Sequence, residues 1–184
     1  MTKLPEAELC HFGLYAHDLN KMVDFYTRAF GLVVTDRGRS GRGFDIAFLS
    51  GHPGEHHQLA IAAGRPAEAT FSTINQVSFR VSGLDDLKRY FTWLTNERVR
   101  DMETRNHGNA WSIYFSDPEG NRMEVYSPTP WYVSQPFGQP LDLTEPSDVI
   151  LAETETMVRQ DPTSCPIEAW SADMRKKLDE VHTA

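Results

Sequence analysis

Residues 11–19, with the sequence HFGLYAHDL, have a counterpart 65 residues later in residues 76–84, QVSFRVSGL. Both stretches begin with polar and apolar residues in alternation, which is typical of a half-buried strand. Both then continue into apolar residues at helical spacing, namely Leu19, Met22, Val23 and Tyr26 in the first and Leu84, Leu87, Phe91 and Leu94 in the second. Asp18 and Ser82 precede these helices at positions suited to N-caps. An internal repeat therefore organises the chain.

Three strand-like runs follow each predicted helix. They are residues 32–37, 44–49 and 57–62 in the first repeat, and 100–104, 111–116 and 122–126 in the second. Glycine, proline, asparagine and aspartate separate the runs, as expected for turns. The pattern predicts a βαβββ unit used twice, in residues 8–64 and 73–128. We interpret residues 8–128 as a single domain of the α+β class.

Residues 129–184 form a C-terminal extension of different composition. Prolines and aromatic residues predict an extended segment first, and residues 147–182 then predict two helical pieces broken at Asp161-Pro162. The exposed aromatic residues favour packing on the chain's own domain or on a neighbouring subunit. The sequence leaves both possibilities open.

Composition excludes several classes of protein. The chain has 184 residues, of which 40% are hydrophobic and 24% charged, a composition typical of globular proteins. Its net charge is −8, and it has no cluster of basic residues of the kind that nucleic-acid binding requires. No apolar run approaches the length of a membrane span, and the first ten residues lack the apolar core of a secretory signal. Cys10 and Cys165 form no CxxC motif, so neither a disulfide framework nor a thiolate zinc site is indicated. We expect a cytoplasmic protein without nucleic-acid or membrane partners.

The repeated βαβββ unit resembles the vicinal oxygen chelate superfamily, which includes glyoxalases, fosfomycin and bleomycin resistance proteins and extradiol dioxygenases. The resemblance implies that paired modules form a cup-shaped mixed sheet, whose first and last strands supply metal ligands. These positions fall on His11, Gln76 and Glu124, and the repeat offset puts a fourth on Leu59, which cannot coordinate. Strand alternation independently predicts that the three polar residues lie on the more polar faces of their strands.

A more specific pattern is HGNAWSIYFSDPEGNRME, residues 107–124. It is similar to the signature of extradiol ring-cleaving dioxygenases, with a histidine, an apolar residue before a tyrosine, an Asp-Pro-x-Gly turn and a metal-binding glutamate. The pair His56-His57 looks like the His-His pair of the family's other module. The resemblance spans residues 8–127. It implies that His57 is an acid/base beside the oxygen site, and that His107 and Tyr114 hydrogen-bond the catechol oxygens.

Two residues depart from the extradiol pattern. Gln76 stands where active extradiol enzymes carry histidine, and an amide oxygen is a harder and weaker donor to iron(II) than imidazole. Glyoxalases do use a glutamine ligand. Arg105 stands where the family prefers a small or aliphatic residue or asparagine. A natural variant, an inactive descendant and an engineered substitution all remain open explanations of Gln76.

The sequence therefore predicts an extradiol-type dioxygenase that opens the ring of a small aromatic diol with dioxygen and iron(II), with manganese, zinc or nickel as alternative metals. The resemblance and the tail favour a homo-oligomer, a dimer or larger. Two alternatives remain. A redox-inert metal-dependent isomerase, lyase or thiol transferase of the same fold would turn over without oxygen. A binding protein that sequesters a planar ligand would need no stoichiometric metal.

Overall fold

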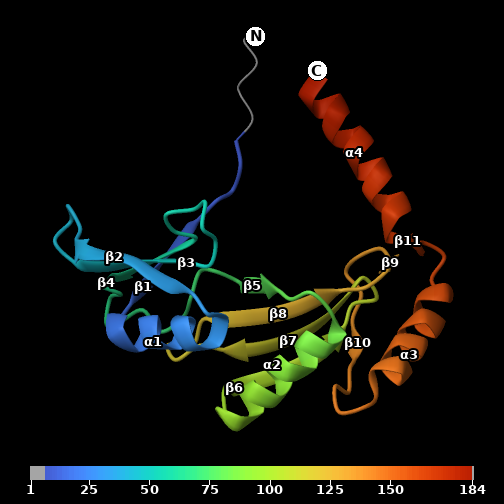
Figure 1. Cartoon of the computed structure of the whole chain (residues 1–184), viewed down its shortest axis with the longest axis horizontal. Helices are drawn as coiled ribbons and strands as arrows, with labels where there is room; N and C mark the ends of the chain where they lie inside the picture. Colours follow the sequence, from blue (N-terminus) through green and yellow to red (C-terminus); the bar gives the residue numbers. More distant parts are fainter. Residues whose placement is uncertain (1–6, 184) are drawn as a thin grey trace. The chain divides into compact units, whose positions relative to one another are not determined.

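The computed structural model describes residues 7–183 (Figure 1). They form two compact units. Unit 1 consists of the described residues up to Thr73 together with Asp117–Asn121, and unit 2 consists of Ile74–Ser116 and the described residues from Arg122 onward. The turn Asp117–Asn121 joins two strands of unit 2 but belongs to unit 1.

Unit 1 contains the first βαβββ module. Its elements are β1 (Phe12–Ala16), α1 (Leu19–Phe30), β2 (Val33–Arg39), β3 (Asp45–Ser50) and β4 (Leu59–Ala63), and the strand order is β1-β4-β3-β2. β1 is parallel to β4, whereas the other neighbours are antiparallel, so the sheet is mixed as predicted. The predicted N-cap is confirmed, because the Asp18 carboxylate accepts a hydrogen bond from the Lys21 amide. α1 ends at Gly31, whose φ of 64° is the left-handed conformation that glycine adopts readily.

Unit 2 contains the second module. Its elements are β5 (Val77–Arg80), α2 (Leu84–Asn96), β6 (Arg100–Asn106), β7 (Ala110–Ser116) and β8 (Arg122–Pro128), and a short strand β10 (Gln139–Pro140) extends the order to β10-β6-β7-β8-β5. β5 is parallel to β8, which repeats the pairing of β1 with β4. The α+β class and the two βαβββ modules are thus confirmed. The predicted Ser82 cap is wrong, because α2 is preceded by Gly83 without a side-chain cap. Asp85 and Asp86 place negative charge in the first turn instead, where the helix dipole favours it.

The C-terminal extension contains β9 (Trp131–Tyr132), α3 (Ser147–Arg159), β11 (Cys165–Pro166) and α4 (Ile167–Thr183), which confirms two helical pieces with a break between them. α3 packs on its own unit. The buried Thr154 hydroxyl accepts hydrogen bonds from the Asn106 amide at 2.8 Å and from the Trp111 indole at 2.9 Å. None of the helices within residues 7–183 combines the length and the apolar character that crossing a bilayer requires.

Candidate active site

The predicted site residues are divided between the two units. Unit 1 carries two of them, His11 and His57, and unit 2 carries the other four, Gln76, His107, Tyr114 and Glu124. Each unit brings its own members together.

Glu124 is the most constrained of the unit 2 residues. It lies on β8 with 7% of its surface exposed, and it pairs with Ser78 of the parallel strand β5. One carboxylate oxygen accepts hydrogen bonds from the Ser78 hydroxyl at 2.5 Å and from the Gln76 amide nitrogen at 2.9 Å. Within residues 7–183 the carboxylate has no cationic side-chain partner. A buried carboxylate without a cation is costly, so Glu124 is well suited to meet a metal ion.

Gln76 lies one residue before β5 and is half-buried. Its side chain already contacts the carboxylate that was predicted to share a metal with it. A rotation of the Gln76 amide group by 180° exchanges its nitrogen and oxygen. The carbonyl oxygen would then lie beside the Glu124 carboxylate, where both oxygens could face one metal ion. The sequence analysis did not indicate Ser78 as a partner of Glu124. The signal that could have found it is strand alternation, which puts residues 76 and 78 on the same face.

His107 and Tyr114 contact each other. His107 follows β6, Tyr114 lies on β7, and the His107 Nε2 is 3.0 Å from the Tyr114 hydroxyl. His107 Nδ1 lies 2.6 Å from the Phe137 carbonyl oxygen, which can only accept. Nδ1 therefore carries the proton, Nε2 is the accepting nitrogen of neutral His107, and the Tyr114 hydroxyl donates to it.

Tyr114 is held in its neutral form. Burial, followed by the neighbouring carboxylate of Glu124, raises the pKa of Tyr114 to about 12. The Arg122 guanidinium, 4.3 Å from the ring centroid, opposes this shift to a smaller extent. At neutral pH the Tyr114 hydroxyl is thus protonated and can donate a hydrogen bond.

Two open cavities of unit 2 meet at this pair. One, of about 300 Å³, is lined among others by Gln76, Arg105 and Arg122. The other, of about 370 Å³, is lined among others by Ser78 and Glu124. His107 and Tyr114 line both cavities, so a small molecule entering either one reaches them.

In unit 1, His11 and His57 lie with their ring centroids 4.2 Å apart. Neither is within a strand, although the sequence pattern predicted both to be. His11 lies one residue before β1 and His57 two residues before β4. The reason is that pairing of β1 with β4 begins at Phe12 and Leu59, which leaves both histidines in the connections that lead into these strands.

His57 is positioned by its neighbour His56 and, through it, by Asp36, which the sequence pattern did not indicate. His56 Nε2 lies 2.7 Å from an Asp36 carboxylate oxygen, and His56 Nδ1 lies 2.9 Å from His57 Nδ1. Because the carboxylate only accepts, His56 holds its proton on Nε2, His57 donates from Nδ1, and Nε2 of neutral His57 keeps its lone pair. Partial burial and the charges of His11 and His56 lower the pKa of His57. The neutral form is therefore favoured near pH 7.

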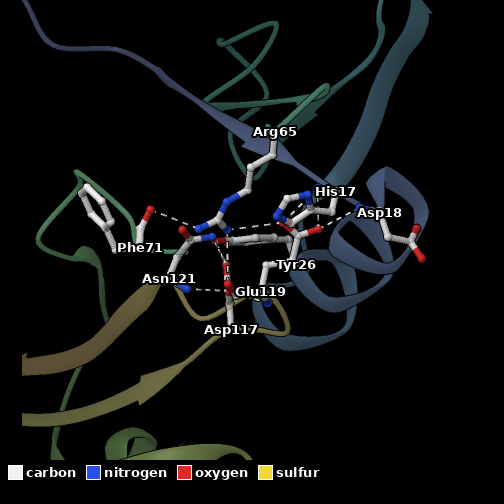
Figure 2. Close-up of polar contacts among 8 residues, drawn as sticks. All are labelled: His17, Asp18, Tyr26, Arg65, Phe71, Asp117, Glu119 and Asn121. Carbon is white, nitrogen blue, oxygen red and sulfur yellow. Dashed lines mark hydrogen bonds and ion pairs between the residues drawn. The ribbon is translucent and has the colours of Figure 1, made fainter. Parts of the chain in front are cut away.

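The Asp-Pro-x-Gly part of the signature has a structural role in unit 1 (Figure 2). The Asp117 carboxylate accepts hydrogen bonds from the backbone amides of Glu119 and Asn121, both at 2.9 Å, and from the Tyr26 hydroxyl of α1 at 3.2 Å. Gly120 has a φ of 82°, which favours glycine at this position. The Asp117 carboxylate therefore stabilises the turn through the turn's own backbone amides and also connects it to α1 through Tyr26.

Glu119, at the unconstrained position of the signature, ties the turn to the start of α1. Its carboxylate accepts hydrogen bonds from the backbone amides of His17 and Asp18, each at 2.8 Å. Arg65 forms an ion pair with it at 3.4 Å, and the two side chains are only 8% and 6% exposed. Figure 2 shows that Arg65 also reaches the carbonyl oxygens of Phe71 and Glu119. No sequence pattern indicated this ion pair.

Strand register corrects the fourth ligand position. Ser78 pairs with Glu124 in unit 2, and the equivalent pair in unit 1 is Gly13 with Ala60. The counterpart of Glu124 is therefore Ala60, and the prediction of Leu59 is wrong by one residue. Leu59 is instead a core residue with 1% of its surface exposed. The chemical consequence is unchanged, since neither side chain can coordinate a metal.

The donor set fits a divalent metal in part. In unit 2 a buried carboxylate and an amide lie in contact, and in unit 1 two imidazoles are in contact. Carboxylate, amide and imidazole donors suit iron(II), manganese and related ions. Within residues 7–183 no cluster of three or more His, Cys, Asp or Glu side chains could hold a metal ion.

Known proteins share this fold and part of this sequence. Residues 8–125 match the model of the Glyoxalase/Bleomycin resistance protein/Dioxygenase superfamily. The chain is 28% identical to biphenyl-2,3-diol 1,2-dioxygenase 3 of Rhodococcus globerulus over 68% of this chain and 64% of that protein, so it spans less than two thirds of that relative. It is 26% identical to the metallothiol transferase FosB of Lysinibacillus sphaericus over 65% of this chain and 81% of that protein.

Solved structures agree on the fold. The fosfomycin resistance protein FosX of Listeria monocytogenes, crystallised with Mn(II) and sulfate, superposes with a TM-score of 0.54 at 20% identity, over 68% of this chain and 95% of that one. The two βαβββ modules and the match of the family model over residues 8–125 together show that the chain belongs to the Glyoxalase/Bleomycin resistance protein/Dioxygenase superfamily.

Proposed function

We propose that the chain is an extradiol-type dioxygenase that opens the ring of a small aromatic diol with dioxygen and iron(II). The observation that carries the proposal is the contact of His107 with Tyr114, which lies directly opposite the buried carboxylate of Glu124. A protein that only binds a ligand has no chemical need for three adjacent groups able to transfer protons, His107, Tyr114 and Glu124. The 28% identity to a dioxygenase named for a biphenyl diol supports the same reaction class.

We propose His11, Gln76 and Glu124 as the metal ligands. The support within unit 2 is that Glu124 is buried without a cationic partner and that Gln76 contacts it at 2.9 Å. The bound iron would supply a path for electrons between the deprotonated diol and dioxygen. Gln76 should weaken iron binding relative to histidine, because the amide oxygen is the poorer donor.

His107 would accept a proton from one diol hydroxyl at Nε2, the nitrogen that now receives the Tyr114 hydroxyl. Tyr114, protonated at neutral pH, would donate a hydrogen bond to the resulting oxyanion. The Phe137 carbonyl holds the proton on His107 Nδ1 and so keeps Nε2 basic. These two residues would bind, orient and deprotonate the diol.

His57 would serve as the second acid/base group. Its lowered pKa keeps it neutral near pH 7, and its contact with His56 leaves Nε2 able to accept a proton. We propose that this nitrogen receives and returns a proton during ring opening. Asp36 and His56 would position it without touching the substrate.

The test is oxygen uptake after anaerobic loading with iron(II), using a panel of catechols and comparing the protein with Gln76→His. Uptake with a yellow ring-opened product is expected, and it should be faster in Gln76→His because iron is held more tightly. Uptake by Gln76→His alone would mean that the rest of the site is competent and only the metal is weakly held. No uptake by either protein with any catechol would refute the proposal.

A redox-inert reaction is the second candidate. It is supported by the 26% identity to a metallothiol transferase, of which the chain covers 81%, and by the amide of Gln76, which suits metals other than iron. Turnover of a thiol under anaerobic conditions with manganese or zinc would favour it over the dioxygenase. In either case we propose that the protein works as a homo-oligomer.

A further inference from the structure

The 300 Å³ cavity of unit 2 carries positive charge for which diol cleavage has no need. Arg105 and Arg122 line it together with Glu103, beside His107 and Tyr114. Two guanidiniums face one carboxylate, so the wall of the cavity is left with a net positive charge. The chain as a whole has a net charge of −8, which makes this local excess a specific feature of the cavity.

Glu103 leaves most of the N–H donors of the two arginines available. It forms an ion pair with Arg105 through one carboxylate oxygen and a longer one with Arg122, at 3.9 Å, through the other. Within residues 7–183 neither guanidinium has another ion pair. Each guanidinium has five N–H donors, and the two side chains remain 40% and 50% exposed, so both can be reached by a ligand.

The arginines lie at a definite place relative to the reactive pair. The Arg122 guanidinium covers the ring of Tyr114, whose hydroxyl reaches His107. Arg105 lies on β6, two residues before His107. An aromatic ligand with its hydroxyls at His107 and Tyr114 would therefore be able to direct a ring substituent toward the guanidiniums.

We propose that the diol substrate carries an anionic ring substituent, a carboxylate, which Arg105 and Arg122 bind. This inference rests on the proposed function, since it names the substrate class of the same site. A planar carboxylate matches the paired N–H groups of arginine, and such charge-assisted hydrogen bonds are among the stronger ones in proteins. Glu103 occupies the carboxylate position in the absence of substrate and competes with it.

The test is calorimetric titration of the purified full chain with 3,4-dihydroxybenzoate and with catechol. The carboxylate-bearing diol should bind about tenfold more tightly, as expected for one charge-assisted contact. Arg105→Gln and Arg122→Gln should each remove most of this preference. Glu103→Gln should increase it, and a gain of affinity cannot arise from misfolding. Arg89→Gln, an exposed arginine of α2, is the matched control and should change nothing.

Equal affinity for the two diols, no measurable binding of 3,4-dihydroxybenzoate, or a preference that survives both arginine substitutions would each overturn the proposal. Oxygen uptake with the same diols, measured in parallel, separates this failure from that of the function. A carboxylate preference without uptake by either the chain or Gln76→His would contradict the dioxygenase and leave the anion site standing.

A second observation concerns α4, which Figure 1 shows leaving β11 and running away from the sheet of unit 2. Its main contacts are with β9 and β11, where Trp170 stacks on Tyr132 with ring centroids 5.3 Å apart. Beyond Trp170 its apolar side chains are exposed, with Met174, Leu178 and Val181 at 37%, 44% and 70%. A helix of this length gains little stability in water unless its apolar face is covered.

The apolar stripe of α4 is symmetric about Met174. Its members are Ile167, Trp170, Met174, Leu178 and Val181, separated by steps of three, four, four and three residues. Two copies packed antiparallel about a twofold axis at Met174 would bring Trp170 against Leu178 and Ile167 against Val181. On one edge of the stripe, Asp173 of one copy would lie within two residues of Lys177 of the other, so opposite charges meet there.

We propose that α4 pairs with α4 of a second copy, antiparallel, with Met174 on the twofold axis. Disulfide trapping tests this arrangement directly. In a Cys10→Ser, Cys165→Ser background, Met174→Cys should form a linked dimer with oxidised glutathione, because a residue on the axis meets its own copy. Ala172→Cys, exposed on the opposite face of α4, should remain unlinked.

Sedimentation of Met174→Lys gives an independent reading, since two lysines on the axis should lower the mass of the assembly at micromolar concentration. Absence of the Met174→Cys dimer, or equally fast linking of Ala172→Cys, would overturn the pairing. An unchanged mass of Met174→Lys would also contradict it. Circular dichroism of each variant verifies that α4 is still folded.

Discussion

Tyr114 lies directly opposite Glu124 in the antiparallel pairing of β7 with β8, and this register places a neutral hydroxyl beside a buried carboxylate. The relationship joins the group proposed to bind the diol to the group proposed to bind the metal. It depends on two adjacent strands of one hairpin, which hold both side chains rigidly.

Tyr114→Phe should lower kcat about tenfold to a hundredfold with a smaller change in KM. The ring and its contact with Arg122 are retained, whereas the donor to the developing oxyanion is lost. Steady-state oxygen uptake on the best diol gives both constants. A variant with unchanged kcat would show that the hydroxyl has no part in the reaction.

The free energy of unfolding should fall by about 2 kcal/mol between pH 10 and pH 12 through Tyr114 alone. The pKa of Tyr114 in the folded chain is about 12, above the value of a free tyrosine. In that interval the unfolded chain ionises while the folded chain does not, so the stability present below pH 10 is lost as pH rises. Urea titrations across this range should show a smaller loss in Tyr114→Phe.

Glu124→Gln should raise the melting temperature of the metal-free protein and abolish its stabilisation by added metal. The carboxylate is buried without a cation, so its neutral isostere removes a cost and keeps an acceptor for the Ser78 hydroxyl. Thermal denaturation with and without iron(II) or manganese measures both effects. Equal stabilisation of the two proteins by metal would contradict the assignment of Glu124 as a ligand.

Arg65→Met should destabilise the protein by about 3–5 kcal/mol, because it leaves the Glu119 carboxylate buried without its cation. The double variant Arg65→Met with Glu119→Gln should recover part of the loss. Denaturant unfolding measures both, and Arg89→Met on the surface of α2 should stay within about 0.5 kcal/mol of the parent. A loss in Arg65→Met as small as in that control would show that the ion pair is unimportant.

The sequence predicted the modules well because their signals are local. Alternation in residues 11–19 and 76–84 and helical spacing from Leu19 and from Leu84 arise from side chains close in sequence, and the structure confirms the elements. The contact of Gln76 with Glu124 could also be anticipated, because first and last strands of a βαβββ unit pair in parallel. The Ser82 cap failed because a single residue's preference is too weak to fix a helix start.

Sequence alone thus determined the two βαβββ modules and their α+β class, and it predicted the residues of the candidate site. Tertiary structure decided the strand register, which moved the fourth ligand position from Leu59 to Ala60. In unit 1 the chain from Gly13 to Phe48 is one residue shorter than the equivalent chain from Ser78 to Tyr114, and the chain from Phe48 to Ala60 is two residues longer than that from Tyr114 to Glu124, so the net shift is one residue. It also decided that Asp36 supports His56 and that Glu119 pairs with Arg65. Periodicity reports which face a residue occupies, whereas these partners are set by loop lengths and by strands distant in the chain, which no local pattern encodes.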